Sequence, residues 1–183
     1  RAASGGGGGG SCSLGASGSA AELSPAQAVA AGWCLINAKR PSEAAIAFER
    51  GLAGSGKTAE DAAYGKSLAL LQTNDSRGAA NVAAQGQLGG KRRQEIGVMA
   101  LEQRIFASYD KGDYQGALSL LRQRSAHASE TRDLTLMRGW SHYQLGQLDE
   151  AERIFRALDR QMSTKQSRSG LAAIENKRTR MVY

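Results

Sequence analysis

The chain has 183 residues, enough for one domain with a hydrophobic core. Hydrophobic residues make up 41% of it and aromatic residues only 5%, and alanine is abundant, which favours closely packed helices over sheets. The formal net charge is +7, no run of 18 apolar residues occurs, and the two cysteines show neither a metal-ligating spacing nor a disulfide framework. We therefore expect no membrane span, no metal site and no cofactor.

The first segment, residues 1–20, is rich in glycine and serine and contains Cys12. It has too little apolar surface to order itself, so we expect a flexible linker or tail. The chain starts at Arg1 with no apolar signal-like stretch after it, which indicates a fragment or a processed chain. Cys34, in an apolar helical segment, is expected to be a small core residue.

A helical pattern begins at Ser24-Pro25, where serine suits the N-cap and proline the first turn. Two segments of it match: residues 32–52 and 139–158 both start with Gly-Trp, with Glu-Ala eleven and twelve residues after the glycine and Phe sixteen after it. Gly65 lies 33 residues after Gly32, and Ala117 lies 34 residues before Ala151. The small and large residues of this repeat that we expect to pack against one another are Gly32, Ala44, Phe48, Gly65, Ala117, Gly139, Ala151 and Phe155.

This period resembles that of the tetratricopeptide repeat (TPR), in which each repeat is a pair of antiparallel helices. The resemblance covers about residues 25–162 and implies an all-α, right-handed solenoid of about four helix pairs, with residues 21–176 as one repeat domain. Glycine makes a helix less stable, so its recurrence at the same position of each repeat indicates that the helices pack closely there. The third unit departs from the pattern, because Ile105 stands where the others have glycine. The turns before residues 117 and 151 should end one helix with glycine and start the next with aspartate.

The stretch GLAGSGKT, residues 51–58, matches the phosphate-binding P-loop pattern at every fixed position. A working P-loop follows a buried strand, but the residues before this one have a helical period. We therefore interpret it as a connection between two helix pairs, in which Thr58 caps a helix starting at Ala59. A nucleotide-binding enzyme that uses Lys57 is the alternative. No catalytic constellation is evident elsewhere, so no catalytic residue is predicted and we expect a protein that is not an enzyme.

In TPR proteins the first helix of each pair lines a concave groove, through positions that flank the glycine. Carried over, the resemblance implies partner-binding candidates at Trp33, Ile36, Lys66, Phe106, Tyr109, Trp140 and Tyr143. Aromatic side chains there could stack on sugar rings or grip a peptide, whereas the alternative is packing between repeats. The clamp that binds chaperone tails needs asparagine just after the glycine, and this chain has Trp33 and Trp140 there.

The C-terminal end carries most of the net positive charge: residues 153–183 hold eight basic and two acidic residues. We expect an amphipathic capping helix from Ser163 to Arg178, with Leu171, Ala172 and Ile174 on its apolar face, and a basic tail over residues 177–183. The basic end, Lys177, Arg178 and Arg180, could contact nucleic acid, anionic lipid or an acidic partner, or could be an ordinary solvated surface.

The alanine- and arginine-rich repeats are similar to the TPR scaffolds of bacterial exopolysaccharide export, including cellulose-secretion proteins. This resemblance implies a non-catalytic scaffold that binds protein partners, and a polysaccharide as a further partner, in the bacterial envelope or periplasm. The alternatives are the nucleotide-binding enzyme and a cytoplasmic TPR regulator whose basic end contacts nucleic acid, although we consider a nucleic-acid partner the weaker expectation.

Overall fold

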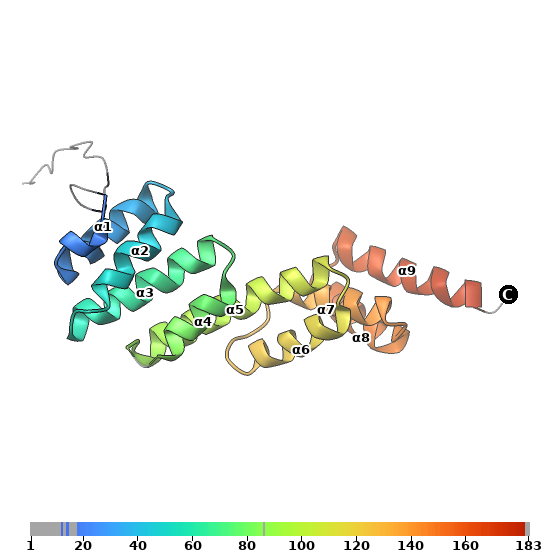
Figure 1. Cartoon of the computed structure of the whole chain (residues 1–183). Coiled ribbons are helices and arrows are strands. Elements are labelled where there is room, and N and C mark those ends of the chain that lie inside the picture. Colours follow the sequence, from blue (N-terminus) through green and yellow to red (C-terminus); the bar gives the residue numbers. More distant parts are fainter. Residues whose placement is uncertain (1–11, 13, 15–17, 86, 182–183) are drawn as a thin grey trace, which may run out of the picture. The chain divides into compact units, whose positions relative to one another are not determined.

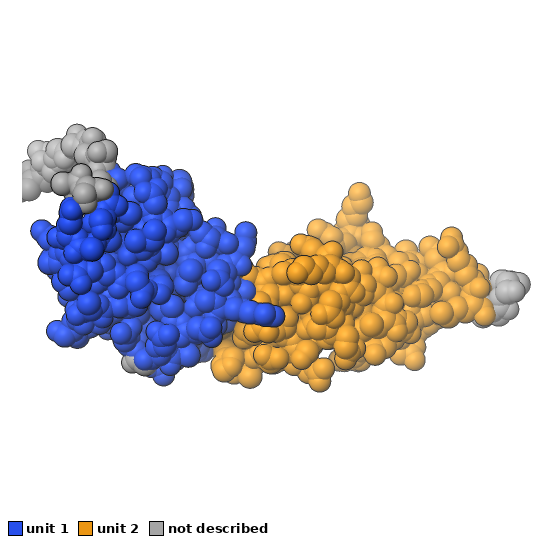
Figure 2. Space-filling model, viewed as in Figure 1, with its two compact units in different colours: residues 1–97 blue, residues 98–183 orange. Residues whose placement is uncertain are grey.

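The computed structural model describes residue 12, residue 14, residues 18–85 and residues 87–181. These residues form nine α-helices and one short 3₁₀-helix, and no strand occurs in this part of the chain (Figure 1). The expected all-α class is therefore confirmed. The chain divides into two compact units, residues 1–97 and 98–183, where the sequence predicts a single repeat domain over residues 21–176 (Figure 2).

Unit 1 contains a 3₁₀-helix, Ala20–Glu22, followed by α1 (Pro25–Asn37), α2 (Pro41–Gly51), α3 (Gly56–Gln72) and α4 (Ser76–Ala84). The predicted start of α1 is confirmed: the Ser24 side chain accepts from Gln27 N–H, and Gln27 accepts in return from Ser24 N–H. The first turns of the next helix, α5 (Gly90–Asp110), belong to unit 1, and the rest of this helix belongs to unit 2.

The core of unit 1 is built around Phe48, which is fully buried. A methyl group added at Gly32 of α1 would lie 2.7 Å from the tip of the Phe48 ring, and one added at Gly65 of α3 would lie 2.7 Å from Cε2 and nearer still to Cε1 and Cζ. The ring therefore fits against the bare backbones of two helices at once. This close packing explains why glycine recurs at the same position of the repeat although it lowers the stability of a helix.

Unit 2 contains the second part of α5, then α6 (Tyr114–Ser125), α7 (Arg132–Gln144), α8 (Leu148–Gln161) and α9 (Lys165–Met181). Ile105, which replaces the repeat glycine, is fully buried against Leu118 and Leu121 of α6. An apolar contact thus takes the place of a glycine contact there. Asp113 caps α6 as predicted, whereas α8 starts one residue after Gln147 and places Asp149 in its first turn, so the predicted aspartate cap is wrong at that helix.

The core of unit 2 repeats the arrangement of unit 1. Phe155 of α8 is fully buried, and added methyl groups at Gly139 of α7 and Gly170 of α9 would lie 2.9 and 2.6 Å from its ring. Gly170 thus relates to Phe155 as Gly65 relates to Phe48. Helix α9 packs on α8 through Gly170 and Ile174, and Leu171 is half-buried, but Ala172 is exposed, in contrast to the predicted apolar face.

A disulfide bond joins Cys12 to Cys34, which corrects the prediction that the chain has no disulfide and that Cys34 is only a core side chain. Arg40 Nη1 also donates to the Cys12 carbonyl at 2.8 Å, and Cys12 and Leu14 pack against the Phe48 core. Most of the predicted linker, residues 1–20, lies outside the described residues. Its described part is bound to unit 1 by these contacts.

The predicted basic tail, residues 177–183, is not a separate segment as far as residue 181, because α9 continues through Met181. Residues 182 and 183 lie outside the described residues. The last basic side chains are consequently fixed by a helix, which determines the direction in which each one points.

Candidate functional site

The P-loop-like stretch joins α2 to α3. Gly51 is the buried last residue of α2, where a side chain would meet Val29 and Ala62. Helix α3 starts at Gly56, which has a φ of +52°, so Thr58 lies inside the helix and does not cap it as predicted. The element before the loop is a helix, and Lys57 is exposed. The glycines of this stretch therefore serve helix packing and a turn.

Both tryptophans pack on the core phenylalanines. The Trp33 ring meets Phe48 edge-on at a centroid distance of 5.0 Å and lies 6.3 Å from Tyr64. The Trp140 ring meets Phe155 at 5.1 Å and Tyr143 at 5.4 Å, again edge-on. Each tryptophan is half-buried. The two matching positions thus have matching surroundings, and much of each ring takes part in packing between helices.

The other predicted groove residues have different surroundings within their own units. Ile36 is half-buried in the Phe48 core, whereas Lys66 forms an ion pair with Glu49 of α2. In unit 2, Phe106 is 44% exposed, and Tyr109 packs edge-on against Tyr114 of α6 at 5.5 Å. Burial raises the pKa of Tyr109, and the neighbouring Tyr114 and Asp110 add to this. Of the candidates, Tyr143 is the one that the structure brings together with the basic end.

A pocket of about 450 Å³ lies between α7 and α9, and we call it the α7–α9 pocket. It is lined by Tyr143, Ala173, Asn176, Lys177 and Arg180. Lys177 Nζ donates to the Tyr143 carbonyl at 3.1 Å and lies 4.5 Å from the centre of the Tyr143 ring. This carbonyl is in the last turn of α7, where the helix dipole favours a cation. The ammonium group is thereby held at the wall of the pocket, with donors left for a ligand.

The three basic side chains at the end of α9 have different surroundings. Arg178 donates to Glu152 and to Asp149 of α8, and the hydrogen bond to Glu152 is the main reason why its pKa is raised. Within the described part of the chain, neither Lys177 nor Arg180 forms an ion pair with a carboxylate. The α7–α9 pocket therefore has two positive charges that form no ion pair with a described acidic side chain.

Sequence reasoning missed Ala173 and Asn176, because it considered only the capping role of α9 and the basic residues at its end. The signal was present: residues 173, 176, 177 and 180 recur at the spacing of one helix face. What the sequence lacks is any sign that this face, and not the face of Arg178, borders a pocket.

Comparison of the chain with protein-family models, with curated proteins and with solved structures gave no significant match. None of the helices in the described part of the chain has the length and apolarity that a membrane crossing requires. Among the same residues, no group of three or more His, Cys, Asp or Glu side chains is placed to hold a metal ion. Function is therefore inferred from the geometry of the two units.

Proposed function

We propose that this protein is a non-catalytic scaffold of the tetratricopeptide-repeat type, which binds an acidic segment of a partner protein in the α7–α9 pocket. The observation that carries the proposal is the pair of cations, Lys177 and Arg180, beside the Tyr143 ring. A carboxylate can accept from both cationic groups, and such charge-assisted hydrogen bonds are among the stronger polar contacts. The ring and Ala173 offer apolar surface next to the charges.

The repeat type is supported by the two equivalent cores. In each, a phenylalanine of one helix fits against glycines of the helices before and after it along the chain: Gly32 and Gly65 for Phe48, and Gly139 and Gly170 for Phe155. Arrays of this kind present extended surface and no deep catalytic cavity. The interaction of both tryptophans with core rings favours a protein partner over a polysaccharide, since less of each ring remains for sugar stacking.

The compartment we propose is an oxidising one, such as the bacterial periplasm, because disulfide bonds persist there and are rare in the cytosol. The Cys12–Cys34 bond supports this placement. The disulfide bond is easier to reconcile with a scaffold in an envelope complex for exopolysaccharide export than with a cytoplasmic regulator.

The test uses a fluorescent peptide that ends in a run of Asp and Glu, with an Asn/Gln version of the same peptide as its control. Fluorescence anisotropy should show binding of the acidic peptide alone, and the double variant Lys177→Ala/Arg180→Ala should weaken it at least tenfold, since each lost charged contact contributes about 1.5–3 kcal/mol. The matched control is Arg160→Ala/Lys165→Ala, which removes the same charge from exposed sites outside the pocket. Equal weakening by both variants, or no binding of the acidic peptide, would contradict the proposal.

A single-stranded oligonucleotide serves as a third ligand in the same assay. If it binds more tightly than the acidic peptide, with a steep loss of affinity as salt rises, the nucleic-acid alternative is correct and the scaffold proposal is wrong.

A further inference from the structure

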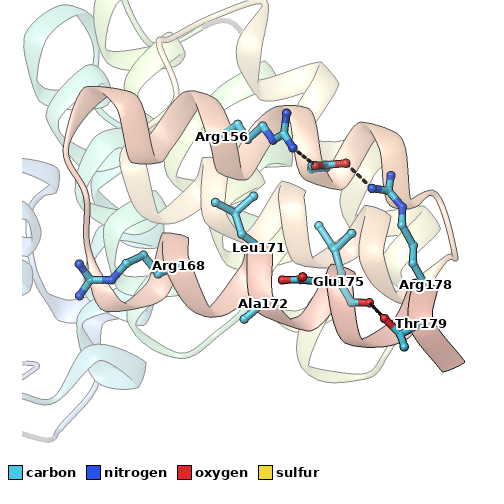
Figure 3. Close-up of a pocket in the computed structure, with 9 residues that line it drawn as sticks. Arg156, Arg168, Leu171, Ala172, Glu175, Arg178 and Thr179 are labelled. Atoms are coloured by element: carbon cyan, nitrogen blue, oxygen red, sulfur yellow. Dashed lines mark hydrogen bonds and ion pairs between the residues drawn. The ribbon is translucent and has the colours of Figure 1, made fainter.

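A second hollow lies on another side of α9, between α8 and α9, and we call it the α8–α9 groove. Its volume is about 630 Å³, and Figure 3 shows the side chains that line it. The α9 residues Arg168, Ala172, Glu175 and Thr179 recur at the spacing of one helix face, and all four are exposed. Leu171, half-buried, lies beside them toward α8.

The charges of the α8–α9 groove fall into two groups. Glu152 of α8 accepts from Arg156 and from Arg178, as the dashed lines in Figure 3 indicate. Arg168 and Glu175, in contrast, form no ion pair with any described residue. Arg168 makes a long hydrogen bond to Ser163 Oγ, at 3.4 Å. The pKa of Asp159 is lowered by hydrogen bonds from Ser167 and Ser163, and the charge of Arg168 adds to this. One exposed face of α9 thus presents one positive and one negative charge that form no ion pair with a described residue.

The order of these side chains is self-complementary. Arg168 and Glu175 are seven residues apart, about two helical turns, and Leu171 and Ala172 lie at the midpoint between them. If a second α9 lies antiparallel across the first on a two-fold axis at this midpoint, each Arg168 faces the Glu175 of the other copy. Leu171 then faces Ala172 of the other copy, and the small alanine lets the two helices approach closely. In a two-fold contact both copies use the same patch, so each residue of the patch must face a complementary residue of that patch on the other copy.

The other unit of the chain shows that this face can receive a helix. Ser67 of α3 lies two residues after Gly65, as Ala172 lies two residues after Gly170. Ser67 is fully buried, and its Oγ approaches the Ala79 carbonyl of α4 at 3.4 Å. The face of α3 that corresponds to the Ala172 face is therefore covered by α4, whereas no described helix covers it on α9.

We propose that two copies of this chain associate through α9, in an antiparallel two-fold contact centred on Leu171 and Ala172, with two Arg168–Glu175 ion pairs between the copies. One helix face per copy gives a contact smaller than the standard stable interface of about 1,600 Å². We therefore expect a dissociation constant in the micromolar range. The proposal does not depend on the α7–α9 pocket, which lies on another side of the helix.

The test measures mass by sedimentation equilibrium of the full oxidised chain from about 1 μM to 1 mM. Wild type should pass from monomer to dimer, and Arg168→Glu and Glu175→Arg should each raise the dissociation constant at least tenfold, because each variant places like charges opposite one another twice. An equimolar mixture of the two variants should dimerise again, because every new carboxylate then faces a guanidinium group of the other variant. The double variant Arg168→Glu/Glu175→Arg should dimerise like wild type for the same reason.

The matched control is Arg180→Glu, which makes the same charge change on α9 but on the side of the α7–α9 pocket. It should leave the dimer unchanged and abolish binding of the acidic peptide, whereas Arg168→Glu should do the reverse, so that the two proposals can fail separately. A monomer at all concentrations, single variants that dimerise like wild type, or a mixture that stays monomeric would each overturn the proposal. Circular dichroism spectra that match wild type show that the variants are folded.

Discussion

The contact between Phe48 and Gly65 gives the sharpest prediction about the fold. Alanine at position 65 would bring its methyl group to 2.7 Å from Cε2 and nearer still to two other ring atoms, whereas ordinary contact starts at 3.4 Å. The ring cannot simply retreat, because it is fully buried and its tip also fits against Gly32. Overpacking costs about 1–3 kcal/mol and this site belongs near the upper end, while alanine gains about 1 kcal/mol of helix propensity over glycine. Gly65→Ala should therefore lower the free energy of unfolding by about 2 kcal/mol.

Gly97→Ala is the matched control, since Gly97 also lies inside a helix but an added methyl group would meet nothing within 4 Å. This substitution should stabilise the protein by about 0.5–1 kcal/mol. The assay is urea unfolding followed by the fluorescence of Trp33, which packs on Phe48, in a Trp140→Phe background that leaves Trp33 as the one tryptophan. The same background applies to every variant.

A double-mutant cycle attributes the loss to the ring. In a Phe48→Leu background the smaller side chain leaves room, so Gly65→Ala should cost at least 1 kcal/mol less than it does in the wild-type background. If Gly65→Ala is as stabilising as Gly97→Ala, or if its cost is the same in both backgrounds, the ring does not require glycine. Close packing against phenylalanine would then not explain why glycine recurs in the repeat.

Two further predictions concern covalent and electrostatic contacts. The Cys12–Cys34 bond closes a loop over a separation of 22 residues, so the Cys12→Ser/Cys34→Ser variant should lose roughly 3 kcal/mol and dithiothreitol should lower wild type to the same stability; an unchanged midpoint of urea unfolding in reductant would contradict this. In unit 2, burial raises the pKa of Glu130, but hydrogen bonds from Arg138 and from Ser125 Oγ, the latter at 2.7 Å, outweigh it and lower the pKa below 4.5. A lowered carboxylate pKa stabilises the fold above the unfolded-state value and ceases to do so as pH falls through the folded-state value. Glu130→Gln should thus cost about 2 kcal/mol at pH 7, and the difference from wild type in urea unfolding should shrink below pH 4.5; a difference independent of pH would refute the assignment.

Those parts of the fold that depend on local sequence could be predicted. The Ser24-Pro25 start and the Asp113 cap are short-range signals, because the side chain and the N–H that it accepts from lie three residues apart. The pairing of repeat glycines with a phenylalanine was also predictable, because glycine at one fixed phase inside helices has few explanations other than close packing. Ile105 shows the limit of this rule. It occupies the position of the repeat glycine, yet it is fully buried, because its partner is Leu118 and not a phenylalanine.

The disulfide bond could not be predicted from spacing. Cys12 lies in a glycine- and serine-rich segment with no periodicity, so its position depends on contacts made in the fold, among them the hydrogen bond from Arg40 to its carbonyl. The surroundings of the groove candidates likewise depend on contacts that spacing does not give. The position after the repeat glycine holds Trp33 in one repeat and Lys66 in the next, and the lysine forms its ion pair with Glu49 of the preceding helix.

The surroundings of each charged side chain on α9 depend on the direction in which it points from the helix, and not on how many charges the helix carries. Arg178 and Lys177 are neighbours in the sequence, yet a helix turns them about 100° apart, so Arg178 meets the carboxylates of α8 while Lys177 lies over the Tyr143 ring. The net charge of +7 therefore does not describe one basic patch. Besides Lys165, α9 carries an arginine paired with α8, two cations at the α7–α9 pocket, and an exposed face with Arg168 and Glu175. Because these surfaces lie on different sides of one helix, a charge reversal at Arg180 and one at Arg168 test the two proposals separately.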